Sequence, residues 1–566
     1  MGKHILTGEE FFDKIIESDG FYVDKTLFIK ELLEKRGAVT LITRPRRFGK
    51  SLNMNTLKCF FDIGLDSRHL FEGLKIMEHS EIVEKHMNKY PVLFFSLKDI
   101  KEPSFEKFIN SLRILVSEIF QEYMYLSEDE SLNLYQKKYF HDYCDKTSTE
   151  EELKKALSFL TNCLYAHHKK RVIVLLDEYD TPINNSLMTG YYADMIGFMS
   201  GFMGSVFKSN KYLEFGVLTG VQRIAQEGLM SCFNNPKVFG IMDEIFATAF
   251  GFTSDEVKDA CRMYGLKDEY NEVERWYNGY RIGGHDIFNP WSIVSYLEEK
   301  KLLDFWTLTG GVNILADIFS KGTPELKDDF AGLLTGKPIK MIYNDRILYP
   351  FLYKRNNVFW SMLFNTGYLK PCVGAEGREF YAELVNQEIK NFFKNCVKDW
   401  FEDEQKSIHP SIEQFVTCLL NGNLDELSSI LNDELLNDPS SHDFKAENSY
   451  HMFIFGILLS VSVDYTVLSN PETGKGRSDC LIKPKDKDKY AVVIEMKHCK
   501  KAPAVSKEAP EINFLEAEAQ TALEQIENKD YIHMLKREGY TRIYKYGIAF
   551  HKKSCEVLIK SPSPER

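Results

Sequence analysis

Apolar runs of strand length alternate with amphipathic helical stretches over the first part of the chain. The runs lie at Val39–Thr43, Tyr90–Leu97, Arg171–Leu176 and Tyr212–Gly220. Because they are continuously apolar, they are typical of strands buried on both faces of a parallel sheet. Strands that alternate with helices in this way predict a doubly wound α/β layer.

The first run leads into a basic loop, residues 44–51, with the sequence RPRRFGKS, and then into a helical pattern. Backbone N–H groups at the start of a helix bind anions, while a Lys-Ser pair offers an ammonium for phosphate and a hydroxyl for Mg²⁺. Arg44 stands where the general phosphate-loop pattern has its first glycine, so a basic strand-to-helix turn is the alternative. The candidate nucleotide ligands are Arg46, Arg47, Gly49, Lys50 and Ser51.

The third run ends in two adjacent acids, Asp177 and Glu178. At the carboxyl end of a central strand, Asp177 can hold Mg²⁺ and Glu178 can orient or deprotonate the water that attacks ATP. Thr219 ends the next run, and Arg223 follows it closely, so both are candidate contacts to the γ-phosphate. Solvated acids and ordinary turn residues are the alternatives, but the two elements together favour nucleotide binding.

After residue 253 the pattern becomes helical, with aromatic clusters at 276–280 and 288–291 that are most simply a packed core or an interdomain wedge. Polar and acidic helices follow, and Asn437–Ser441 is a candidate boundary. The predicted domains are a phosphate-loop domain (1–253), a helical lid or winged-helix-like region (254–383), a helical connector (384–440) and a C-terminal α/β domain (441–566).

Two acidic residues flank the strands of a predicted hairpin in the C-terminal domain. Asp479 precedes a short apolar run, and Glu495 lies near the end of the run Tyr490–Lys497. If these strands pair around a turn at Lys483–Lys489, the two carboxylates meet at one end of the sheet. Glu495 and Lys497 then project from the same face, because side chains alternate along a strand.

Such a cluster is suited to phosphodiester chemistry. Two carboxylates can bind Mg²⁺ or Mn²⁺, which polarises a phosphodiester and lowers the pKa of a bound water, while the lysine stabilises developing charge. Glu447 is a candidate third metal ligand, and Gln525 and Tyr531, on the helical stretch Ala517–Leu535, are candidate contacts to the scissile backbone. The alternative is a solvated hairpin with a Glu–Lys pair.

Composition narrows the classes of protein that fit. The 566 residues are 44% hydrophobic and 27% charged, as in globular chains with several domains. No apolar stretch approaches the roughly 20 residues that a membrane span needs, and the N-terminus lacks a signal-peptide core, so a cytoplasmic location is expected. The 11 cysteines include no Cys-x-x-Cys pair, which argues against zinc ribbons and a disulfide framework.

The charge distribution says little about a polyanionic partner. The formal net charge of −12 gives no chain-wide footprint for nucleic acid. Residues 471–566, however, carry 19 Lys and Arg against 15 Asp and Glu. This local excess of base permits a nucleic-acid partner at the C-terminal end without demonstrating one.

Six blocks of the sequence together resemble the AAA-ATPase-like family, whose members typically carry a C-terminal domain of the PD-(D/E)XK nuclease superfamily. The resemblance covers nearly the whole chain and implies a P-loop NTPase sheet, a helical middle region and a restriction-endonuclease-like α/β domain. It implies phosphate binding at Gly49-Lys50-Ser51, metal and water handling at Asp177-Glu178, and a nuclease-type centre at Asp479, Glu495 and Lys497. The blocks are Tyr22–Thr26, Thr43–Ser51, Leu176–Asp180, Thr219–Arg223, Trp276–Tyr280 and Asn365–Tyr368.

The sequence therefore favours an ATP-binding protein fused to a metal-dependent nuclease, in which the nucleotide gates cleavage of DNA. One alternative is a nucleotide-switched scaffold that binds nucleic acid or protein through an inactive nuclease fold. Another is an NTPase with a purely structural C-terminal domain. The expected ligands are ATP, Mg²⁺ and, at the nuclease site, Mg²⁺ or Mn²⁺. DNA is the expected partner, and a homo-oligomer is compatible with the sequence.

Overall fold

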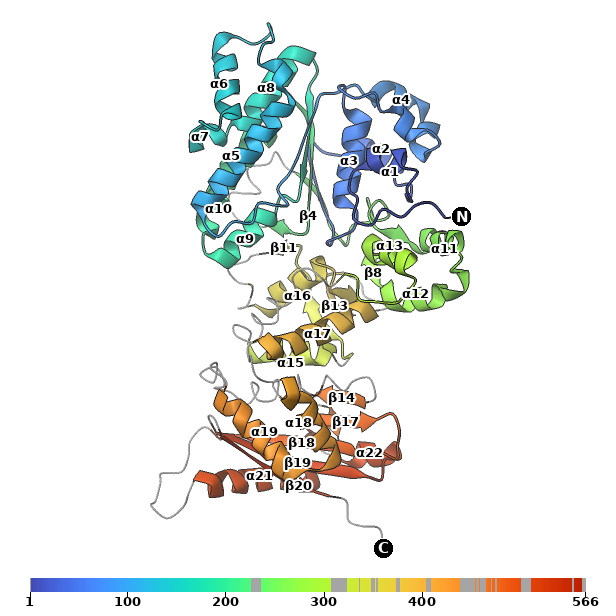
Figure 1. Ribbon diagram of the computed structural model, residues 1–566, viewed down its shortest axis with the longest axis vertical. Helices are drawn as coiled ribbons and strands as arrows, with labels where there is room; N and C mark the ends of the chain where they lie inside the picture. Colours follow the sequence, from blue (N-terminus) through green and yellow to red (C-terminus); the bar gives the residue numbers. More distant parts are fainter. Residues whose placement is uncertain are drawn as a thin grey trace. The chain divides into compact units, whose positions relative to one another are not determined.

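The computed structural model (Figure 1) divides into two compact units. Unit 1 comprises Met1–Trp306, Met341–Phe380 and Val385–Glu388, and unit 2 comprises Thr307–Lys340, Tyr381–Leu384 and Ile389–Arg566. The four domain boundaries expected from the sequence stay a prediction. The residues described are 2–224, 236–306, 323–334, 336–347, 352, 355–372, 377–403, 409–437, 454, 458, 465–469, 471–473, 476–499, 511–551 and 554–561.

A five-stranded parallel sheet forms the centre of unit 1. Its strands follow the order β2-β3-β4-β1-β6. The four long apolar runs of the sequence supply the first four of these strands, and β1 and β3 are buried along their whole length. The strands are β1 (Val39–Thr43), β2 (Val92–Ser96), β3 (Val172–Asp177), β4 (Leu213–Gly220) and β6 (Lys237–Phe239).

Helices cover both faces of this sheet, as in a doubly wound layer. In Figure 1, α1 to α4 lie on one side of the strands and α5, α8 and α10 on the other. The helices are α1 (Phe12–Glu17), α2 (Leu27–Lys35), α3 (Lys50–Phe61), α4 (Ser80–His86), α5 (Phe105–Glu122), α6 (Leu134–Cys144), α7 (Glu150–Leu153), α8 (Ala156–His168), α9 (Thr181–Thr189) and α10 (Tyr192–Phe207). Short 3-10 turns are η1 (Arg68–Phe71), η2 (Lys75–Glu78), η3 (Met124–Leu126) and η5 (Lys267–Glu269).

The middle of the chain is largely helical, as the sequence predicts. Its helices are α11 (Ser254–Met263), α12 (Tyr270–Tyr277), α13 (Pro290–Glu299), α15 (Pro324–Leu334), α16 (Asn356–Asn365) and α17 (Gln387–Asp403). Its strands are short: β5 (Arg223–Ile224), β7 (Phe252–Thr253), β8 (Tyr280–Ile282), β9 (His285–Phe288), β10 (Ile339–Ile342), β11 (Arg346–Ile347), β12 (Leu369–Pro371) and β13 (Glu379–Leu384). The aromatic cluster at 276–280 contributes Tyr277 to a buried core with α11 and α13.

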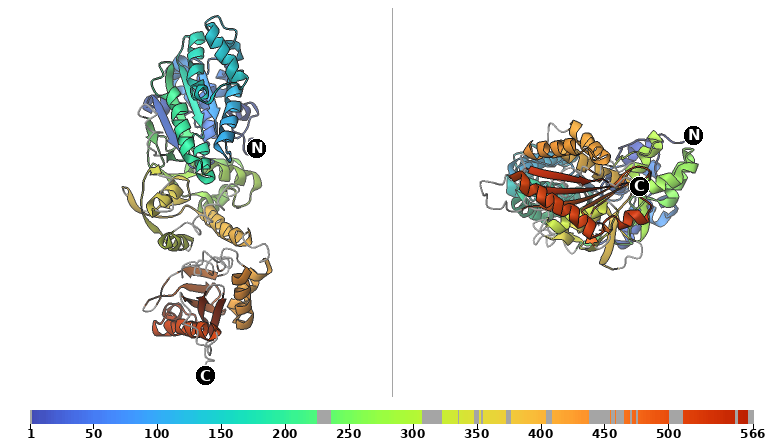
Figure 2. Two further views of the ribbon diagram at one scale, coloured as in Figure 1. Left: turned by 90° about the vertical axis from the view of Figure 1, so that its left-hand side faces the viewer. Right: turned by 90° about the horizontal axis from the view of Figure 1, so that it is seen from below.

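Unit 2 contains a mixed sheet in the order β14-β17-β18-β19-β20, of which only β18 and β19 run parallel. Figure 2 shows α21 on one side of this sheet and α18 and α19 on the other. The strands are β14 (Tyr465–Ser469), β15 (Glu472–Thr473), β16 (Gly476–Arg477), β17 (Cys480–Pro484), β18 (Ala491–His498), β19 (Ile543–His551) and β20 (Ser554–Lys560). The helices are α18 (His409–Asn421), α19 (Leu424–Asn437), α21 (Glu511–Asn528) and α22 (His533–Arg537).

The predicted fold class is confirmed in both units: a parallel sheet between helices, a helical middle, and a C-terminal mixed sheet with helices. Among the residues that the structure describes, no helix is both long and apolar enough to cross a membrane.

Candidate functional sites

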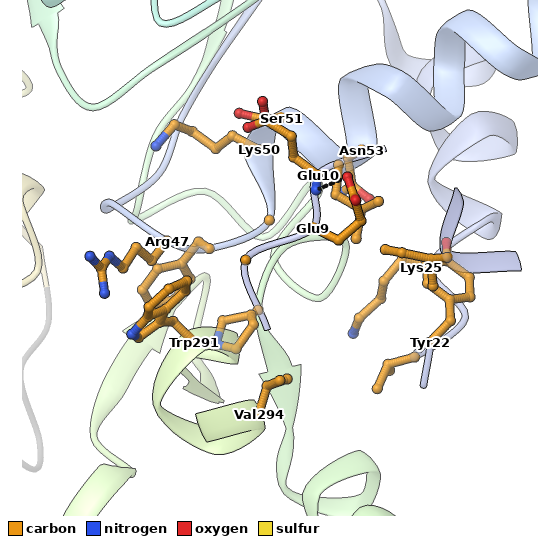
Figure 3. A pocket seen from close by; sticks show the side chains of 18 of the residues that line it. Glu9, Glu10, Tyr22, Lys25, Arg47, Lys50, Ser51, Asn53, Trp291 and Val294 are labelled. Carbon is orange, nitrogen blue, oxygen red and sulfur yellow. Dashed lines mark hydrogen bonds between the residues drawn. The ribbon is translucent and has the colours of Figure 1, made fainter. Parts of the chain in front are cut away.

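The basic loop of unit 1 joins the end of β1 to the start of α3. Gly49 precedes the helix with φ of 76°, in the left-handed region that glycine enters without strain. The first turn of α3, with Lys50 and Ser51, borders a cavity of about 320 Å³. Figure 3 shows this cavity between Lys50 and Ser51, the Arg47–Trp291 pair, and Tyr22 with Lys25. The loop thus has the strand-to-helix geometry that the sequence predicts for an anion site.

Lys50 and Ser51 each contact one of the two adjacent acids at the end of β3. Lys50 Nζ lies 3.0 Å from Glu178 Oε1 and donates to the Pro45 carbonyl at 3.1 Å. Ser51 Oγ donates to Asp177 Oδ2 at 2.6 Å, and Thr219 Oγ1 donates to Asp177 Oδ1. The structure therefore brings five of the predicted residues into one cluster, namely Lys50, Ser51, Asp177, Glu178 and Thr219.

The two adjacent acids have shifted pKa values of opposite sign. Burial, reinforced by the charge of Glu178, raises the pKa of Asp177. Burial also opposes ionisation of Glu178, but the Lys50 ammonium outweighs it and lowers the pKa of Glu178 below its ordinary value. Glu178 also has φ of 52°, which is uncommon for a residue with a side chain. This backbone conformation is locally strained, and it directs the Glu178 carboxylate onto Lys50.

The arginines of the loop have different surroundings. Arg46 is exposed, and its charge helps to lower the pKa of Glu178. The Arg47 guanidinium lies 4.0 Å from the centre of the Trp291 ring (Figure 3). Arg47 lines the cavity and is already held by an aromatic ring, whereas Arg46 is not among the residues that line it.

Arg44, which replaces the first glycine of the general phosphate-loop pattern, is fully buried. Its guanidinium donates to four backbone carbonyls, at distances of 2.8 to 3.2 Å. The carbonyls belong to Thr43, Phe239, Gly240 and Phe246. Sequence reasoning interpreted Arg44 as a departure from the pattern, whereas the structure gives it a structural role that ties the loop to β6.

Arg223 is not brought to the loop cavity. Its guanidinium pairs with Asp345 at 2.5 Å, and it lines a separate cavity of about 380 Å³ together with Thr43 and Tyr343. The reason is β5, which pairs with β11 and carries Arg223 towards that strand. A contact between Arg223 and a γ-phosphate stays a prediction for which this arrangement offers no geometric support.

Sequence reasoning gave no role to Tyr179 and Asp180, which follow the two acids. The Asp180 carboxylate accepts from the backbone N–H groups of Val221 and Gln222 at 3.1 and 2.9 Å. Tyr179 Oη donates to the Gln222 carbonyl at 2.6 Å. Burial raises the pKa of Asp180 to about 6. The pair fixes the turn after β4 and thereby the position of Thr219.

In unit 2 the predicted hairpin forms. Strands β17 and β18 pair antiparallel, with Cys480 opposite Ile494, so Asp479 and Glu495 occupy neighbouring positions at one end. The Met496 backbone N–H donates to Asp479 Oδ2 at 2.6 Å. This contact holds the Asp479 carboxylate against the strand that carries Glu495.

Glu495 and Lys497 project from one face of β18, and α21 covers that face with Gln525. Lys497 Nζ lies 3.6 Å from Glu495 Oε1 and donates to Gln525 Oε1 at 2.6 Å. Gln525 Nε2 donates to Glu495 Oε1 and also lies 3.2 Å from Tyr531 Oη. Tyr531 lies in the turn after α21, whereas the sequence expectation was a continuous helical stretch. All of these residues meet in one cluster.

The electrostatics of this cluster suit a cation. Glu495 is 3% exposed, and burial together with the charge of Asp479 raises its pKa to about 8. Its Oε2 atom is buried and accepts no hydrogen bond from the residues that the structure describes. A buried carboxylate oxygen beside a second carboxylate is an environment that a hard divalent cation stabilises.

The third expected metal ligand, Glu447, lies outside the described residues. Among those that are described, no group of three His, Cys, Asp or Glu side chains is arranged to hold a metal ion. Asp479 and Glu495 thus form a two-carboxylate centre, which fits a cation that keeps several water ligands, as Mg²⁺ does.

Together the fold and these clusters define a P-loop NTPase-like domain followed by a restriction-endonuclease-like domain. Residues 7–230 match the family model described as predicted AAA-ATPase (AAA-ATPase-like). Residues 445–559 match that of the PD-(D/E)XK nuclease superfamily. The chain therefore contains a domain that matches each of these two models, in the order that the sequence resemblance implied.

One curated relative aligns with nearly the whole chain. A chain from Azotobacter chroococcum mcd 1, described as "Uncharacterized protein in vnfD 5'region", is 25% identical over 577 aligned positions. The alignment covers 98% of each chain. This relative carries no stated activity, so the functional argument rests on the two sites.

Proposed function

We propose that the protein is an ATP-gated nuclease that cleaves DNA phosphodiesters with a divalent metal ion. The observation that carries the proposal is the Asp479–Glu495–Lys497 cluster on β17 and β18, in the same chain as the Lys50–Glu178 and Ser51–Asp177 contacts. The nucleotide-binding and nuclease-like domains support such a fusion. DNA as the substrate and ATP as the gate are the parts that need experiment.

On the nucleotide side, the chain's own groups have separable roles. The N–H groups at the start of α3 and the Lys50 ammonium bind the phosphates, and Ser51 and Asp177 would hold the Mg²⁺. Because Lys50 is 4% exposed and paired with Glu178, phosphate binding exchanges one buried ionic contact for another. Glu178 is then released to orient the attacking water.

On the nuclease side, Asp479 and Glu495 would hold the divalent ion. When bound, the ion polarises the phosphodiester and lowers the pKa of a coordinated water. Lys497 contributes positive charge beside the reacting phosphate, and Gln525 fixes both Lys497 and Glu495 through its amide. Tyr531 is 2% exposed and belongs to the hydrophobic core of this domain, so its hydroxyl supports the Gln525 amide and does not present a surface to the nucleic-acid backbone.

The decisive experiment measures cleavage of supercoiled, linear and single-stranded DNA by the full chain. Mg²⁺ or Mn²⁺ is supplied with and without ATP, and the parent is compared with Glu495→Gln and Lys50→Ala. We expect metal-dependent cleavage by the parent, background cleavage by Glu495→Gln, and loss of the ATP response in Lys50→Ala. A matched control is Glu538→Gln, which alters an exposed carboxylate of unit 2 that pairs with Lys483 at 3.0 Å.

Two outcomes would contradict the proposal. Equal cleavage by the parent and Glu495→Gln would place the activity elsewhere, or in a contaminant. Cleavage that depends on Glu495 but is the same with and without ATP, in both the parent and Lys50→Ala, would remove the gating while leaving the nuclease.

A second candidate function is a nucleotide-switched scaffold with an inactive nuclease fold. It is favoured by the two-carboxylate centre among the described residues and by the engagement of Lys497 with Gln525. Binding of labelled DNA separates the candidates. A scaffold would bind DNA equally with and without metal, and Asp479→Asn would leave both binding and the absence of product unchanged.

A further inference from the structure

The outer side of the phosphate loop is enclosed by residues from the middle of the chain. Gly367, with φ of 86°, approaches Pro45 so closely that a Cβ there would lie 2.9 Å from the proline ring. The Phe48 ring packs against Tyr280 with ring centres 4.9 Å apart. Two sequence blocks with no assigned role, Trp276–Tyr280 and Asn365–Tyr368, are therefore parts of the wall that supports the loop.

Polar contacts join the same loop to α13 and to the segment before Trp306. The Arg46 carbonyl accepts from Asn289 Nδ2 and from Trp306 Nε1, both at a long 3.4 Å. The Phe305 carbonyl accepts from the Trp291 indole at 3.1 Å and from the Arg47 guanidinium at 3.3 Å. Because Arg47 also stacks on Trp291, the loop cannot move here without disturbing both elements.

These elements converge on a single buried carboxylate, Glu388, at the start of α17. Its Oε2 accepts from Ser292 Oγ of α13 at 2.8 Å, and its Oε1 accepts from the Trp306 backbone N–H at 2.7 Å. Glu388 and Ser292 are both fully buried. Glu388 is also the last residue of unit 1 on this stretch of chain, since Ile389 and the rest of α17 belong to unit 2.

We propose that Glu388 is a positioning residue that links the phosphate loop to the first turn of α17. Glu388 bonds the Ser292 hydroxyl on α13 and the backbone N–H of Trp306. Residues of α13 and of the 303–306 segment in turn contact Arg46 and Arg47 of the loop. A nucleotide that shifts the loop therefore changes the environment of the α17 N-terminus. The inference rests on the proposed nucleotide binding and names the route by which that binding reaches the helix leading into unit 2.

Glu388 couples the two elements because both of them bond its carboxylate. A carboxylate with both oxygens bonded to different elements fixes their separation, and its removal takes away the acceptor that the Trp306 N–H and the Ser292 hydroxyl share. Coupling through such a network is typically worth between a few-fold and about thirtyfold in affinity. By linkage, ATP must then change the stability of the α17 turn by the same factor as the turn changes ATP affinity.

The test uses the full chain and ATP that carries a fluorescent label on the ribose, with Mg²⁺. Affinity is measured for the parent, Glu388→Ala and Glu388→Gln, and amide hydrogen exchange is followed over residues 288–306 and 387–396. We expect Glu388→Ala to weaken ATP binding about tenfold and to abolish the ATP-induced change in exchange at 387–396. Glu388→Gln, which keeps an acceptor oxygen, should restore most of both.

Two further variants keep the inference testable if Glu388→Ala does not fold. Ser292→Ala removes the hydroxyl that donates to Glu388, and Trp306→Phe removes the indole N–H that donates to the Arg46 carbonyl. Each change should weaken ATP binding about threefold. Glu272→Gln, at an exposed carboxylate that pairs with Arg275 on α12, is the control and should match the parent. A purely structural role would lower thermal stability without altering the exchange response to saturating ATP.

The outcomes separate this inference from the proposed function. A parent that does not bind ATP would overturn both. A parent that binds ATP and cleaves DNA, but shows no ATP-induced change at 387–396, would overturn the inference alone. ATP affinity in all of the Glu388, Ser292 and Trp306 variants within twofold of the parent would do the same.

Discussion

In the phosphate-loop site Glu178 lies 3.0 Å from the Lys50 ammonium, whereas in the C-terminal site Glu495 lies beside a second carboxylate, Asp479. Both glutamates are largely buried, yet the pKa of Glu178 is lowered and that of Glu495 is raised to about 8. The sign follows from the neighbouring charge, because burial alone favours the neutral acid in both places.

This comparison indicates what each site requires of its ligand. The phosphate-loop site balances its charges internally, so an anionic ligand has to displace Glu178 from Lys50. The C-terminal site has two carboxylates and one lysine that also bonds Gln525, so it gains most from an added cation. Glu388 is an intermediate case, since its acceptors face neutral donors and burial raises its pKa to about 7.

The largest expected effect concerns the frame of the phosphate-loop site. Arg44→Met removes the buried guanidinium that donates to four backbone carbonyls, and we expect a loss of about 3–5 kcal/mol in the free energy of unfolding of unit 1. Arg46→Met, at an exposed position of the same loop, is the matched control and should change it by less than about 0.5 kcal/mol. The measurement is thermal unfolding, followed at the transition whose temperature ATP shifts. Equal effects of the two changes would contradict the structural role of Arg44.

Glu388 is a buried acid whose hydrogen-bond partners are uncharged, and it predicts that the stability of unit 1 depends on pH. The pKa of Glu388 is about 7 in the folded protein and near 4.5 when unfolded. The unfolded chain therefore loses this proton first, and the stability of unit 1 falls as pH rises from 4.5 to 7, by at most about 3 kcal/mol.

Glu388→Gln should remove this part of the pH dependence, because the amide does not titrate. The measurement is the unfolding temperature of the ATP-shifted transition between pH 5 and pH 8, for parent and variant. Asp304, whose charge also raises the pKa of Glu388, and Arg47, whose charge faces Glu388, are present in both proteins and therefore act on both profiles. Parallel profiles would mean that Glu388 ionises normally.

The internal ion pair of the phosphate-loop site predicts opposite effects for its two members. Lys50→Ala should weaken ATP binding about 100-fold, since it removes a charge-assisted contact to phosphate. Glu178→Gln should strengthen ATP binding by about threefold to tenfold, because Lys50 no longer has a competing carboxylate. Fluorescence titration with labelled ATP checks both, and a weaker Glu178→Gln complex would show that the pair does not compete with phosphate.

The smallest predicted effect concerns the support of the C-terminal carboxylates. Gln525→Ala removes the amide that holds both Glu495 and Lys497, and we expect Mn²⁺ binding to the full chain to weaken about tenfold. Gln520→Ala changes an exposed residue on the same helix, whose amide donates to Glu524, and should match the parent. Calorimetric titration with Mn²⁺ distinguishes them, and identical affinities would remove Gln525 from the site.

Much of each site was predictable because local sequence rules act over a few residues. The continuous apolar runs predicted β1 to β4, and the Gly-Lys-Ser sequence predicted the start of α3. Strand alternation and the turn between β17 and β18 predicted that Glu495 and Lys497 share a face and that Asp479 joins them. The pairing of Arg223 with Asp345 was not predictable in this way, because β5 pairs with a strand more than 100 residues later.

The sequence by itself determined the strands, the loop that starts α3, and the hairpin that brings Asp479 to Glu495, because these depend on side-chain periodicity and short-range turns. Only the tertiary structure decided that Glu178 pairs with Lys50, that the buried Arg44 guanidinium donates to four carbonyls, and that Glu388 bonds Ser292. Except for the Arg44 contact to its neighbour Thr43, these contacts join residues 96 to 202 positions apart in the chain. Their geometry depends on how sheets and helices pack, which no local pattern encodes.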